Sequence, residues 1–350
     1  MPPSESRNTF PPARILGIES SCDETAAAVV ENGRVILSNV VASQADLHAQ
    51  FGGVFPEVAS RQHIRTIYPI LEQALQQAHL SLADINAIAV TRGPGLPGSL
   101  VVGMNAAKGL ALATGLPIIG INHLEAHVYS AWLYNVEAEP LPQPLFPLIA
   151  LIVSGGHTEL VLMTDHLTYQ RLGATRDDAA GEAFDKVARV LGLAYPGGPA
   201  IQKASSKGNS TAFNFPRAWL EGTWDFSFSG IKTAVLREVR SMEGHANPMP
   251  VADLASSFQA AVVDMLVSKT IKAAERYQAK GILVVGGVSA NKTLRESIFM
   301  RVKIPVHIPP TWLCTDNAAM VAGVGYYRYA AGQRDSLDID VNPNWPMSEL

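Results

Sequence analysis

The chain has 350 residues, of which 47% are hydrophobic and 17% charged, with a formal net charge of -4 at pH 7. This length predicts about two domains, and the negative charge excludes a uniformly basic RNA-binding protein, so any RNA would need a local basic patch or a partner. No apolar run reaches the ~18 residues of a membrane span, residues 1–12 lack a secretion signal, and the two cysteines, Cys22 and Cys314, fit a reducing cytoplasm.

The first half opens on a β-rich segment. We expect residues 1–13 to form a disordered tail. Residues 14–38 then predict a strand, a polar turn, a second strand, a tight Asn32-Gly33 hairpin and a third strand. The polar turn contains Asp23 and Glu24 among several hydroxyl residues. These groups could serve a phosphate or a metal-bound ligand, although turns favour such residues for backbone reasons as well.

Residues 57–78 predict a long helix with one apolar face, formed by Ile64, Ile67, Leu71, Ala74 and Leu75. Arg61, His63 and Arg65 near its start are interpreted as a solvated face, with a partner or RNA surface as the alternative. A strand at 85–91 and the glycines of 93–98 then match the G-x-G-x-x-G dinucleotide pattern in form. We reject that pattern, because two prolines remove backbone donors that a pyrophosphate needs.

A pair of histidines follows the next predicted strand, residues 116–121. Asn122 is a candidate N-cap, and His123 and His127 then lie one turn apart on the same face of a helix. Two imidazoles in this arrangement are half of a metal site, and the alternative is a pair that only forms hydrogen bonds. Glu125 is rotated by ~200° from His123, which argues against the zinc-protease mechanism, where the acid directly follows the first histidine.

The second half repeats the opening of the first. After a proline-rich linker at 137–147, residues 148–163 again predict strand, small polar turn and strand, with a third strand at 169–173. This repetition indicates a duplicated α/β unit. Gly155 and Gly156 in the turn would let backbone N–H groups approach an anionic ligand closely.

The remaining segments predict helices at 177–191, 229–242, 251–279 and 318–331, and a buried strand at 281–285 that leads to Asn291. Residues 196–199 are interpreted as a turn with exposed amides. The basic and aromatic residues of 203–224 are interpreted as loop anchors, with an RNA grip as the alternative. Asp316 lies at the start of the last helix, where a capping role would suffice.

Six motifs in order give the chain a family resemblance. They are Asn122-His-Leu-Glu-Ala-His127, Val153-Ser-Gly-Gly-His157, Gly181-Glu-Ala-Phe-Asp-Lys186, Pro196-Gly-Gly-Pro199, Gly286-Gly-Val-Ser-Ala-Asn291 and Cys314-Thr-Asp-Asn317. Together they resemble the tRNA N6-adenosine threonylcarbamoyltransferase family, formerly described as O-sialoglycoprotein endopeptidases. The resemblance covers about residues 14–335.

The resemblance implies the α/β fold of actin-like ATPases, sugar kinases and heat-shock chaperones, with two duplicated ribonuclease-H-like lobes around a central cleft. We expect an N-terminal lobe at 14–140, completed by the helix at about 318–335, and a C-terminal lobe at 147–317. By resemblance, one divalent metal, iron(II) with zinc as the alternative, is held by His123, His127 and Asp316. The substrate residues implied are Val153, Ser154, Gly155, Gly156, His157, Asp185, Gly198 and Asn291.

The implied reaction transfers threonylcarbamoyl from threonylcarbamoyl-AMP to N6 of adenosine 37, in tRNAs that read codons starting with A. The proton on N6 needs a base, and Asp23, Glu24 and His157 are the candidates. The resemblance also implies a smaller paralogous subunit, for which we expect the helix around 61–67 as the contact, an ATPase subunit, and a cytoplasmic location without a membrane. The rival functions are a metalloendopeptidase and an ATP-dependent kinase or ATPase of the same fold.

Overall fold

The structure is a computed structural model, and it describes residues 12–242 and 248–350. Most of the expected N-terminal tail, residues 1–11, lies outside the described residues. At the edge of this range Ala13 is already buried, and its carbonyl accepts a hydrogen bond from the backbone N–H of Asn32 at 2.9 Å. The chain is therefore already packed into the core immediately before the first predicted strand.

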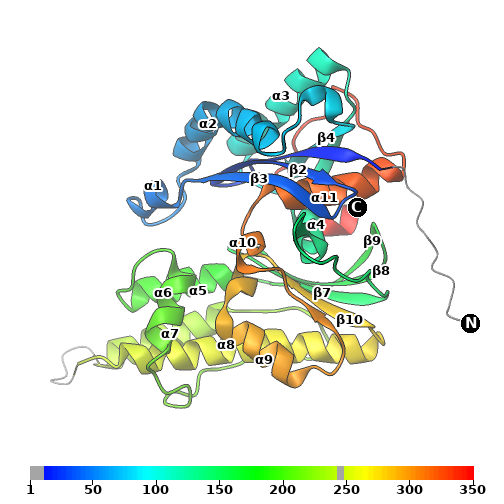
Figure 1. Cartoon of the computed structure of the whole chain (residues 1–350). Helices are drawn as coiled ribbons and strands as arrows, with labels where there is room; N and C mark the ends of the chain where they lie inside the picture. Colours follow the sequence, from blue (N-terminus) through cyan, green and yellow to red (C-terminus); the bar gives the residue numbers. More distant parts are fainter. Residues whose placement is uncertain (1–11, 243–247) are drawn as a thin grey trace, which may run out of the picture.

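Two sheets form the framework, and they share a five-strand topology to which the first sheet adds the short β6 (Figure 1). The first has the order β5-β4-β1-β2-β3-β6 and the second the order β11-β10-β7-β8-β9. In each sheet the first three strands in chain order pair antiparallel with one another. The fourth strand then pairs in parallel with the first, and the fifth pairs in parallel with the fourth. The duplication that the sequence predicts is confirmed. The strands are β1 (Arg14–Glu19), β2 (Glu24–Glu31), β3 (Val35–Ser43), β4 (Ala87–Gly93), β5 (Ile118–Asn122), β6 (Tyr134–Asn135), β7 (Leu148–Val153), β8 (Thr158–Asp165), β9 (Thr168–Ala174), β10 (Gly281–Val285) and β11 (Val306–His307).

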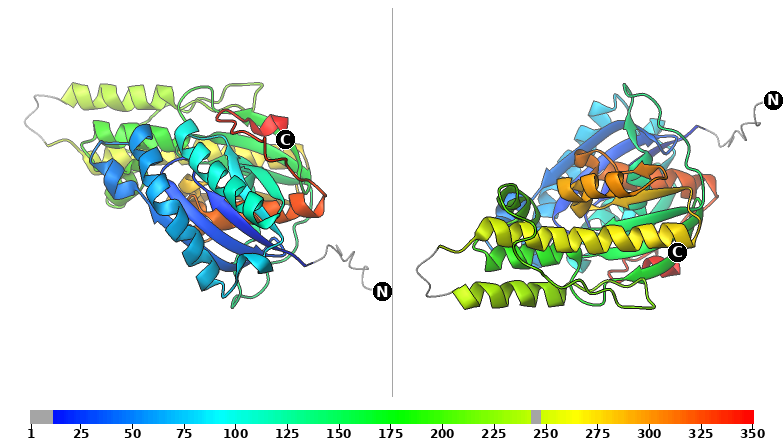
Figure 2. Two further views of the ribbon diagram at one scale, coloured as in Figure 1. Left: turned by 90° about the horizontal axis from the view of Figure 1, so that it is seen from above. Right: turned by 90° about the horizontal axis from the view of Figure 1, so that it is seen from below.

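Helices cover the outer face of each sheet, as the views from above and below show (Figure 2). Helices α2 (Pro56–Gln77) and α3 (Pro97–Thr114) cover the first sheet and share an apolar core with it. The second sheet packs in the same way on a helical layer. That layer comprises α5 (Ala180–Val190), α6 (Gly197–Ser205), α7 (Ser229–Met242), α8 (Val251–Arg276) and α9 (Lys292–Arg301).

A third core lies between the two sheets and contains α4 (His123–Tyr129) and α11 (Ala318–Ala330). The inner faces of β1, β7 and β10 contribute to the same core. Helix α11 approaches β1 closely at Gly17, where an added Cβ would lie only 2.8 Å from the Ala322 nitrogen. The other two α-helices among the described residues are short: α1 (Ala45–Ala49) lies at the edge of the first lobe, and α10 (Thr311–Cys314) precedes α11 (Figure 1). The N-terminal end of α11, which begins two residues after Asp316, is therefore held beside α4.

Helix α8 is the one helix among the described residues that is long and apolar enough to cross a membrane, with a mean hydropathy of 1.3 in its most apolar window. The sequence analysis found no such segment. However, 67% of that window is buried inside the protein. Because its apolar surface packs against the second sheet, α8 is a core helix of the second lobe.

Several local predictions are wrong. The side chain of His63 on α2 is fully buried rather than solvated, whereas Ile64, assigned to the apolar face, is 65% exposed. Residues 196–199 do not form a turn with exposed amides, because Gly197 begins α6 and donates its N–H to Asp185 Oδ1 at 2.7 Å. The cap of α11 is Asn317 rather than Asp316.

Candidate active site and metal centre

Helix α4 presents two histidines on one face because its start is fixed by a cap. The Asn122 Oδ1 atom accepts hydrogen bonds from the backbone N–H groups of Leu124 at 2.9 Å and Glu125 at 3.2 Å. The cap follows directly on β5, a fully buried strand. The ring centroids of His123 and His127 are consequently 4.7 Å apart, with the ring planes at 80°.

Asp316 reaches both imidazoles from the segment before α11. The Asn317 side chain caps this helix by accepting from the Met320 N–H at 3.1 Å, so Asp316 lies one residue outside the helix. The Asp316 Oδ1 atom is 3.2 Å from His127 Nε2 and 3.5 Å from His123 Nε2. All three predicted ligand atoms lie within 4.8 Å of one another. The structure therefore brings Asp316 to two neighbouring histidines that are far from it in sequence.

These residues fit a divalent cation. Both ring nitrogens of His127 are buried and form no hydrogen bond with the described residues: Nδ1 has no partner, and Nε2 lies 3.2 Å from Asp316 Oδ1 without hydrogen-bond geometry. Leaving a buried polar atom without a partner costs about 1–3 kcal/mol, which coordination to a cation would offset. Two imidazoles and one carboxylate with open positions are the donor set that iron(II) accepts, and zinc also uses these ligands.

Glu19 stands behind His123, and the sequence analysis missed it. Its Oε2 atom lies 3.1 Å from His123 Nδ1 and accepts a hydrogen bond from the Thr91 hydroxyl at 2.7 Å. A carboxylate in this position favours a proton on Nδ1, which leaves Nε2 facing Asp316. Burial lowers the pKa of His123, but the Asp316 and Glu19 carboxylates outweigh it and raise that pKa to about 9. The sequence signal that could have identified Glu19 is its position as an acidic residue at the carboxyl end of a predicted central strand.

A cavity of about 700 Å³ adjoins this centre and is lined by both lobes. His123 and Asp316 form part of its wall, together with the three candidate bases Asp23, Glu24 and His157. Burial, with the Asp316 and Asp23 carboxylates nearby, raises the pKa of Glu24 to about 9. Burial and the neighbouring His123 and His127 lower the pKa of His157 to about 4. The cavity thus places His123 and Asp316 beside ionisable side chains of different basicity.

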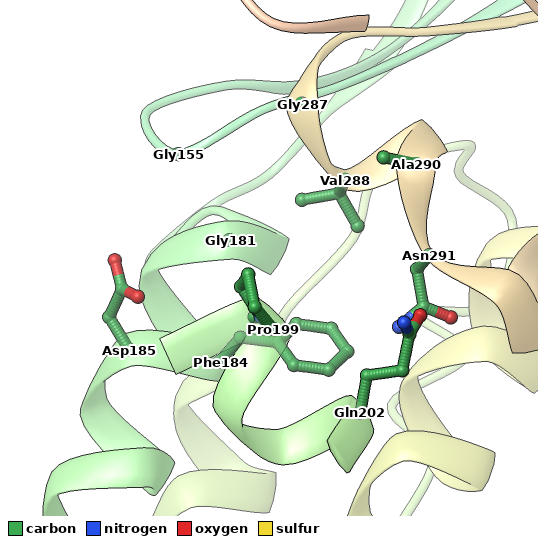
Figure 3. A pocket seen from close by; sticks show the side chains of 11 residues that line it. Gly155, Gly181, Phe184, Asp185, Pro199, Gln202, Gly287, Val288, Ala290 and Asn291 are labelled. Carbon is green, nitrogen blue, oxygen red and sulfur yellow. The ribbon is translucent and has the colours of Figure 1, made fainter. Parts of the chain in front are cut away.

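A second cavity of about 230 Å³ lies in the second lobe (Figure 3). Asp185 is at one end of it, and Asn291 and Gln202 are at the other. Asn291 also caps α9 through its Oδ1 atom, and its amide nitrogen donates to Gln259 Oε1 at 2.8 Å. Gly155, Asp185 and Gly287 line both cavities, so the two spaces adjoin at these residues.

Seven of the eight predicted substrate residues line one or both cavities, namely Ser154, Gly155, Gly156, His157, Asp185, Gly198 and Asn291. Val153 is the exception, because its side chain is fully buried in β7. The turn after β7 is closed by two hydrogen bonds between Ser154 and His157, at 2.9 and 3.1 Å. An added Cβ at Gly155 or Gly156 would meet no atom within 4 Å, so this turn is open to a ligand.

The basic and aromatic segment at 203–224 does not reach either cavity. Phe215 is buried in the core of the second lobe, and Arg217 Nε donates to Asp264 Oδ2 at 2.8 Å. The ammonium of Lys272 lies 5.0 Å from the ring centroid of Trp219. These contacts agree with the interpretation that the aromatic residues anchor the loop to its own lobe.

Comparisons with known proteins identify relatives over nearly the whole chain. A relative from Dehalococcoides mccartyi, named tRNA N6-adenosine threonylcarbamoyltransferase, is 56% identical over 330 residues, which are 94% of this chain and 98% of the relative. Proteins with the same name from Thermomicrobium roseum and Geobacillus kaustophilus are 53% and 52% identical, each over 95% of this chain and 96% of the relative.

Solved structures with a similar fold have low sequence identity. HypF from T. kodakarensis matches with a TM-score of 0.59 at 16% identity, covering 92% of this chain and 48% of HypF. The Acidaminococcus fermentans (R)-2-hydroxyglutaryl-CoA dehydratase component A matches with a TM-score of 0.51 at 16% identity, covering 91% and 99%. These likenesses concern the fold alone, and with the duplicated sheets they confirm the expected actin-like α/β fold.

The family model described as tRNA N6-adenosine threonylcarbamoyltransferase matches residues 35–323, which include the two histidines of α4, Asp316, the whole lining of the smaller cavity and the lining of the larger one apart from residues 21–24. This match and the relatives at 52–56% identity agree with each other. The chain therefore belongs to the tRNA N6-adenosine threonylcarbamoyltransferase family.

Proposed function

We propose that this protein transfers the threonylcarbamoyl group from threonylcarbamoyl-AMP to N6 of adenosine 37 in tRNAs that read codons starting with A, which forms t6A. Family membership supports the activity. The observation that carries the assignment to this site is the cluster of His123, His127 and Asp316, two of whose members form the wall of a 700 Å³ cavity between the lobes. That volume is in the range of small-molecule sites.

The proposed metal is one divalent cation, iron(II) with zinc as the alternative, held by the Nε2 atoms of His123 and His127 and by the Asp316 carboxylate. The unpaired nitrogens of His127 support this assignment. When bound there, the cation would supply Lewis acidity and positive charge for the phosphate of the acyl-adenylate. Glu19 would keep His123 in the required orientation through its contact with Nδ1.

The adenylate would extend from the larger cavity into the smaller one. The open glycines of the 154–157 turn would allow backbone N–H groups to contact the phosphate or a developing oxyanion. Asp185, which faces both cavities, would accept hydrogen bonds from a ribose or a threonyl group, and Asn291 would meet the adenine. Gly198 would leave room for the nucleotide, and Val153 would act only through its backbone.

The acceptor, N6 of adenosine 37, is a weak nucleophile, because this exocyclic amine is conjugated with the purine ring. The mixed anhydride supplies a good leaving group, AMP, and a base takes the proton from N6. Asp23, Glu24 and His157 are the candidates, and all three line the larger cavity. Asp23 is our choice for a first test, because it belongs to the first-lobe turn that faces the glycine-rich turn of the second lobe across the cavity.

We further propose that a smaller paralogous subunit and an ATPase subunit act with this protein in the cytoplasm. The outer face of α2 supports the paralogue contact, since Ile64 and Tyr68 on it are 65% and 71% exposed. Arg61 and Arg65 flank these side chains and are exposed. Apolar residues bordered by charged ones are typical of a protein-binding surface.

The test supplies purified protein, with and without the paralogous subunit, with threonylcarbamoyl-AMP and a tRNA transcript that carries adenosine at position 37. We expect t6A in the digested tRNA by liquid chromatography and mass spectrometry, and none in a transcript with guanosine 37. His127→Ala should abolish metal uptake and product. Asp23→Asn should lower the rate by about 100-fold or more while leaving metal uptake intact.

The same preparations separate the rival functions. Phosphoryl transfer from ATP alone, without t6A formation from the complete mixture, would contradict the proposal in favour of a kinase or ATPase. Cleavage of a polypeptide by the metal-loaded protein would favour an endopeptidase, which the orientation of Glu125 opposes: its carboxylate points away from the metal-binding face and contacts Arg328. An Asp23→Asn protein with the wild-type rate would remove Asp23 from the candidate bases.

A further inference from the structure

Glu125 lies between the two histidines in sequence but takes no part in the site described above. Its side chain is fully buried on the opposite face of α4. The Glu125 Oε2 atom lies 2.8 Å from both Nε and Nη2 of Arg328, and Nε donates a hydrogen bond to it. The Oε1 atom accepts a hydrogen bond from the Tyr169 hydroxyl at 2.9 Å. The carboxylate is therefore fully used by partners within the protein.

These partners come from elements far apart in sequence. Arg328 lies near the C-terminal end of α11, whose N-terminal end follows Asp316. Tyr169 lies on β9 of the second sheet. The Arg328 side chain is 12% exposed, and its Nη1 donates to Gln333 Oε1 at 2.7 Å. One buried carboxylate thus connects the helix that carries both histidines, the helix that follows the aspartate, and the second lobe.

We propose that the Glu125–Arg328 ion pair, with Tyr169, is a positioning device for the metal centre that fixes the rotation of α4 about its own axis relative to α11. This inference rests on the proposed function, because it assumes that His123, His127 and Asp316 hold the metal. It assigns no contact with metal or substrate to Glu125, which acts through the helices.

The geometry explains why such a device is effective. Helix α4 has only seven residues, and His123 and His127 share one face while Glu125 occupies the other. A rotation of α4 would therefore move both imidazoles away from Asp316 together. A planar guanidinium resists this rotation better than an ammonium would, because its Nε and Nη2 converge on Oε2 in one fixed plane while Tyr169 holds Oε1.

Burial of an ion pair is not by itself evidence of a stabilising role. Replacing a buried pair by neutral residues of similar volume is often neutral for stability, whereas removing one partner leaves an uncompensated buried charge and is strongly destabilising. A pair that contributes little to stability, but joins the helix that carries both histidines to the helix that follows Asp316, is expected to affect metal binding more than folding. This difference makes the positioning role testable.

The test measures Co²⁺ and Zn²⁺ affinity by competition with a chromophoric chelator, together with the visible absorption of the Co²⁺ form. The double variant Glu125→Gln, Arg328→Met removes both charges. We expect it to fold with a melting temperature near that of the wild type, to bind Co²⁺ about 10-fold more weakly, and to show an altered Co²⁺ spectrum. The matched control is Arg14→Met, Glu31→Gln, which removes the 2.9 Å ion pair between β1 and β2 and should change neither affinity nor spectrum.

Unchanged Co²⁺ affinity and spectrum in a folded double variant would overturn this inference alone, provided that His123→Ala abolishes binding. If the wild type binds no metal, the proposed metal site and this inference both fail. If the double variant does not fold, Arg328→Lys tests the inference instead, since it keeps the positive charge at residue 328 and removes the planar guanidinium. A loss of Co²⁺ affinity of about threefold or more supports the positioning role, and an unchanged affinity rejects it.

Discussion

His63 and His127 are both fully buried histidines, yet their ring nitrogens have different surroundings. The Nδ1 atom of His63 lies 2.8 Å from the Thr25 hydroxyl, and its Nε2 lies 3.0 Å from the Cys22 carbonyl. Both nitrogens of His127 lack a hydrogen-bond partner among the described residues. The two residues do not differ in burial, but they differ in hydrogen bonding, and the unmet hydrogen bonding of His127 supports the proposal that it is the metal ligand of the two.

Asp177 offers a test of a single carboxylate with a structural role. Its Oδ1 atom accepts the Phe228 N–H at 2.8 Å, and its Oδ2 accepts the Ser229 hydroxyl at 2.6 Å, at the start of α7. Partial burial raises the pKa of Asp177, but the hydrogen bonds from Ser227, Ser229 and the backbone outweigh it, so the pKa lies below the ordinary value of 3.8. The ionised form is therefore favoured by folding.

A folded-state pKa below the unfolded value means that the stabilisation is complete above about pH 4 and is lost as the pH falls through the folded pKa. We expect Asp177→Asn to lower the free energy of unfolding by about 1 kcal/mol at pH 7, a figure reduced for solvent screening because the side chain is exposed. The difference from wild type should shrink below about pH 4. Urea titrations at pH 7 and at the lowest pH where the wild type stays folded measure it.

The control is Asp46→Asn, on the exposed surface of α1, which should change the free energy of unfolding by less than about 0.5 kcal/mol at both pH values. An Asp177→Asn difference that grows as the pH falls would contradict the assignment of a lowered pKa.

At the scale of the elements, patterns of neighbouring residues predicted the strands well and the helix boundaries less well. The hairpin at Asn32-Gly33 and the cap at Asn122 were predicted because their signals are local. Helix α5 begins at Ala180 rather than at 177, because Asp177 bonds to the start of α7, and no local pattern contains that contact.

The same distinction applies to the candidate site. The spacing of His123 and His127 is a local signal, whereas nothing near Asp316 in sequence shows that it reaches them. Only the family resemblance linked the three residues. Glu19 was missed, because its role depends on the approach of α4 to the end of β1, which is a tertiary contact.

The contact between β1 and α11 predicts a mutation that acts on packing between elements. In Gly17→Ala the added Cβ would lie 2.8 and 2.9 Å from the nitrogen and Cβ of Ala322, so α11 would have to move away from β1. Overpacking of this kind costs about 1–3 kcal/mol of unfolding free energy. Because Asp316 precedes α11, Co²⁺ affinity should fall as well. Urea denaturation and the chelator competition measure both effects.

Gly109→Ala on α3 is the matched control, since the same methyl group there meets no atom within 4 Å at an exposed helical position. It should stabilise the protein by about 0.5–1 kcal/mol through helix propensity and leave Co²⁺ affinity unchanged. Equal effects of the two substitutions would contradict the close approach at Gly17.

For the molecule as a whole, the two lobes are joined differently on the two sides of the cleft. The core that contains α4 and α11 is continuous with both sheets, and the Tyr169–Glu125 hydrogen bond lies within it. At the mouth of the larger cavity, Arg189 of α5 donates through Nη2 to the Gly52 carbonyl at 2.8 Å. A buried connection on one side and an exposed hydrogen bond on the other would allow the lobes to open at the mouth.

We therefore expect Arg189→Ala to loosen the cavity mouth without unfolding the protein. Amide hydrogen exchange of residues 50–54 should become faster, and the KM for threonylcarbamoyl-AMP should rise about fivefold, equivalent to one hydrogen bond of ~1 kcal/mol. The melting temperature should stay unchanged, because an exposed contact contributes little to stability. Arg276→Ala at the exposed end of α8 is the control. Unaltered exchange at 50–54 in Arg189→Ala would mean that this contact does not hold the lobes together, and that closure depends on the buried core alone.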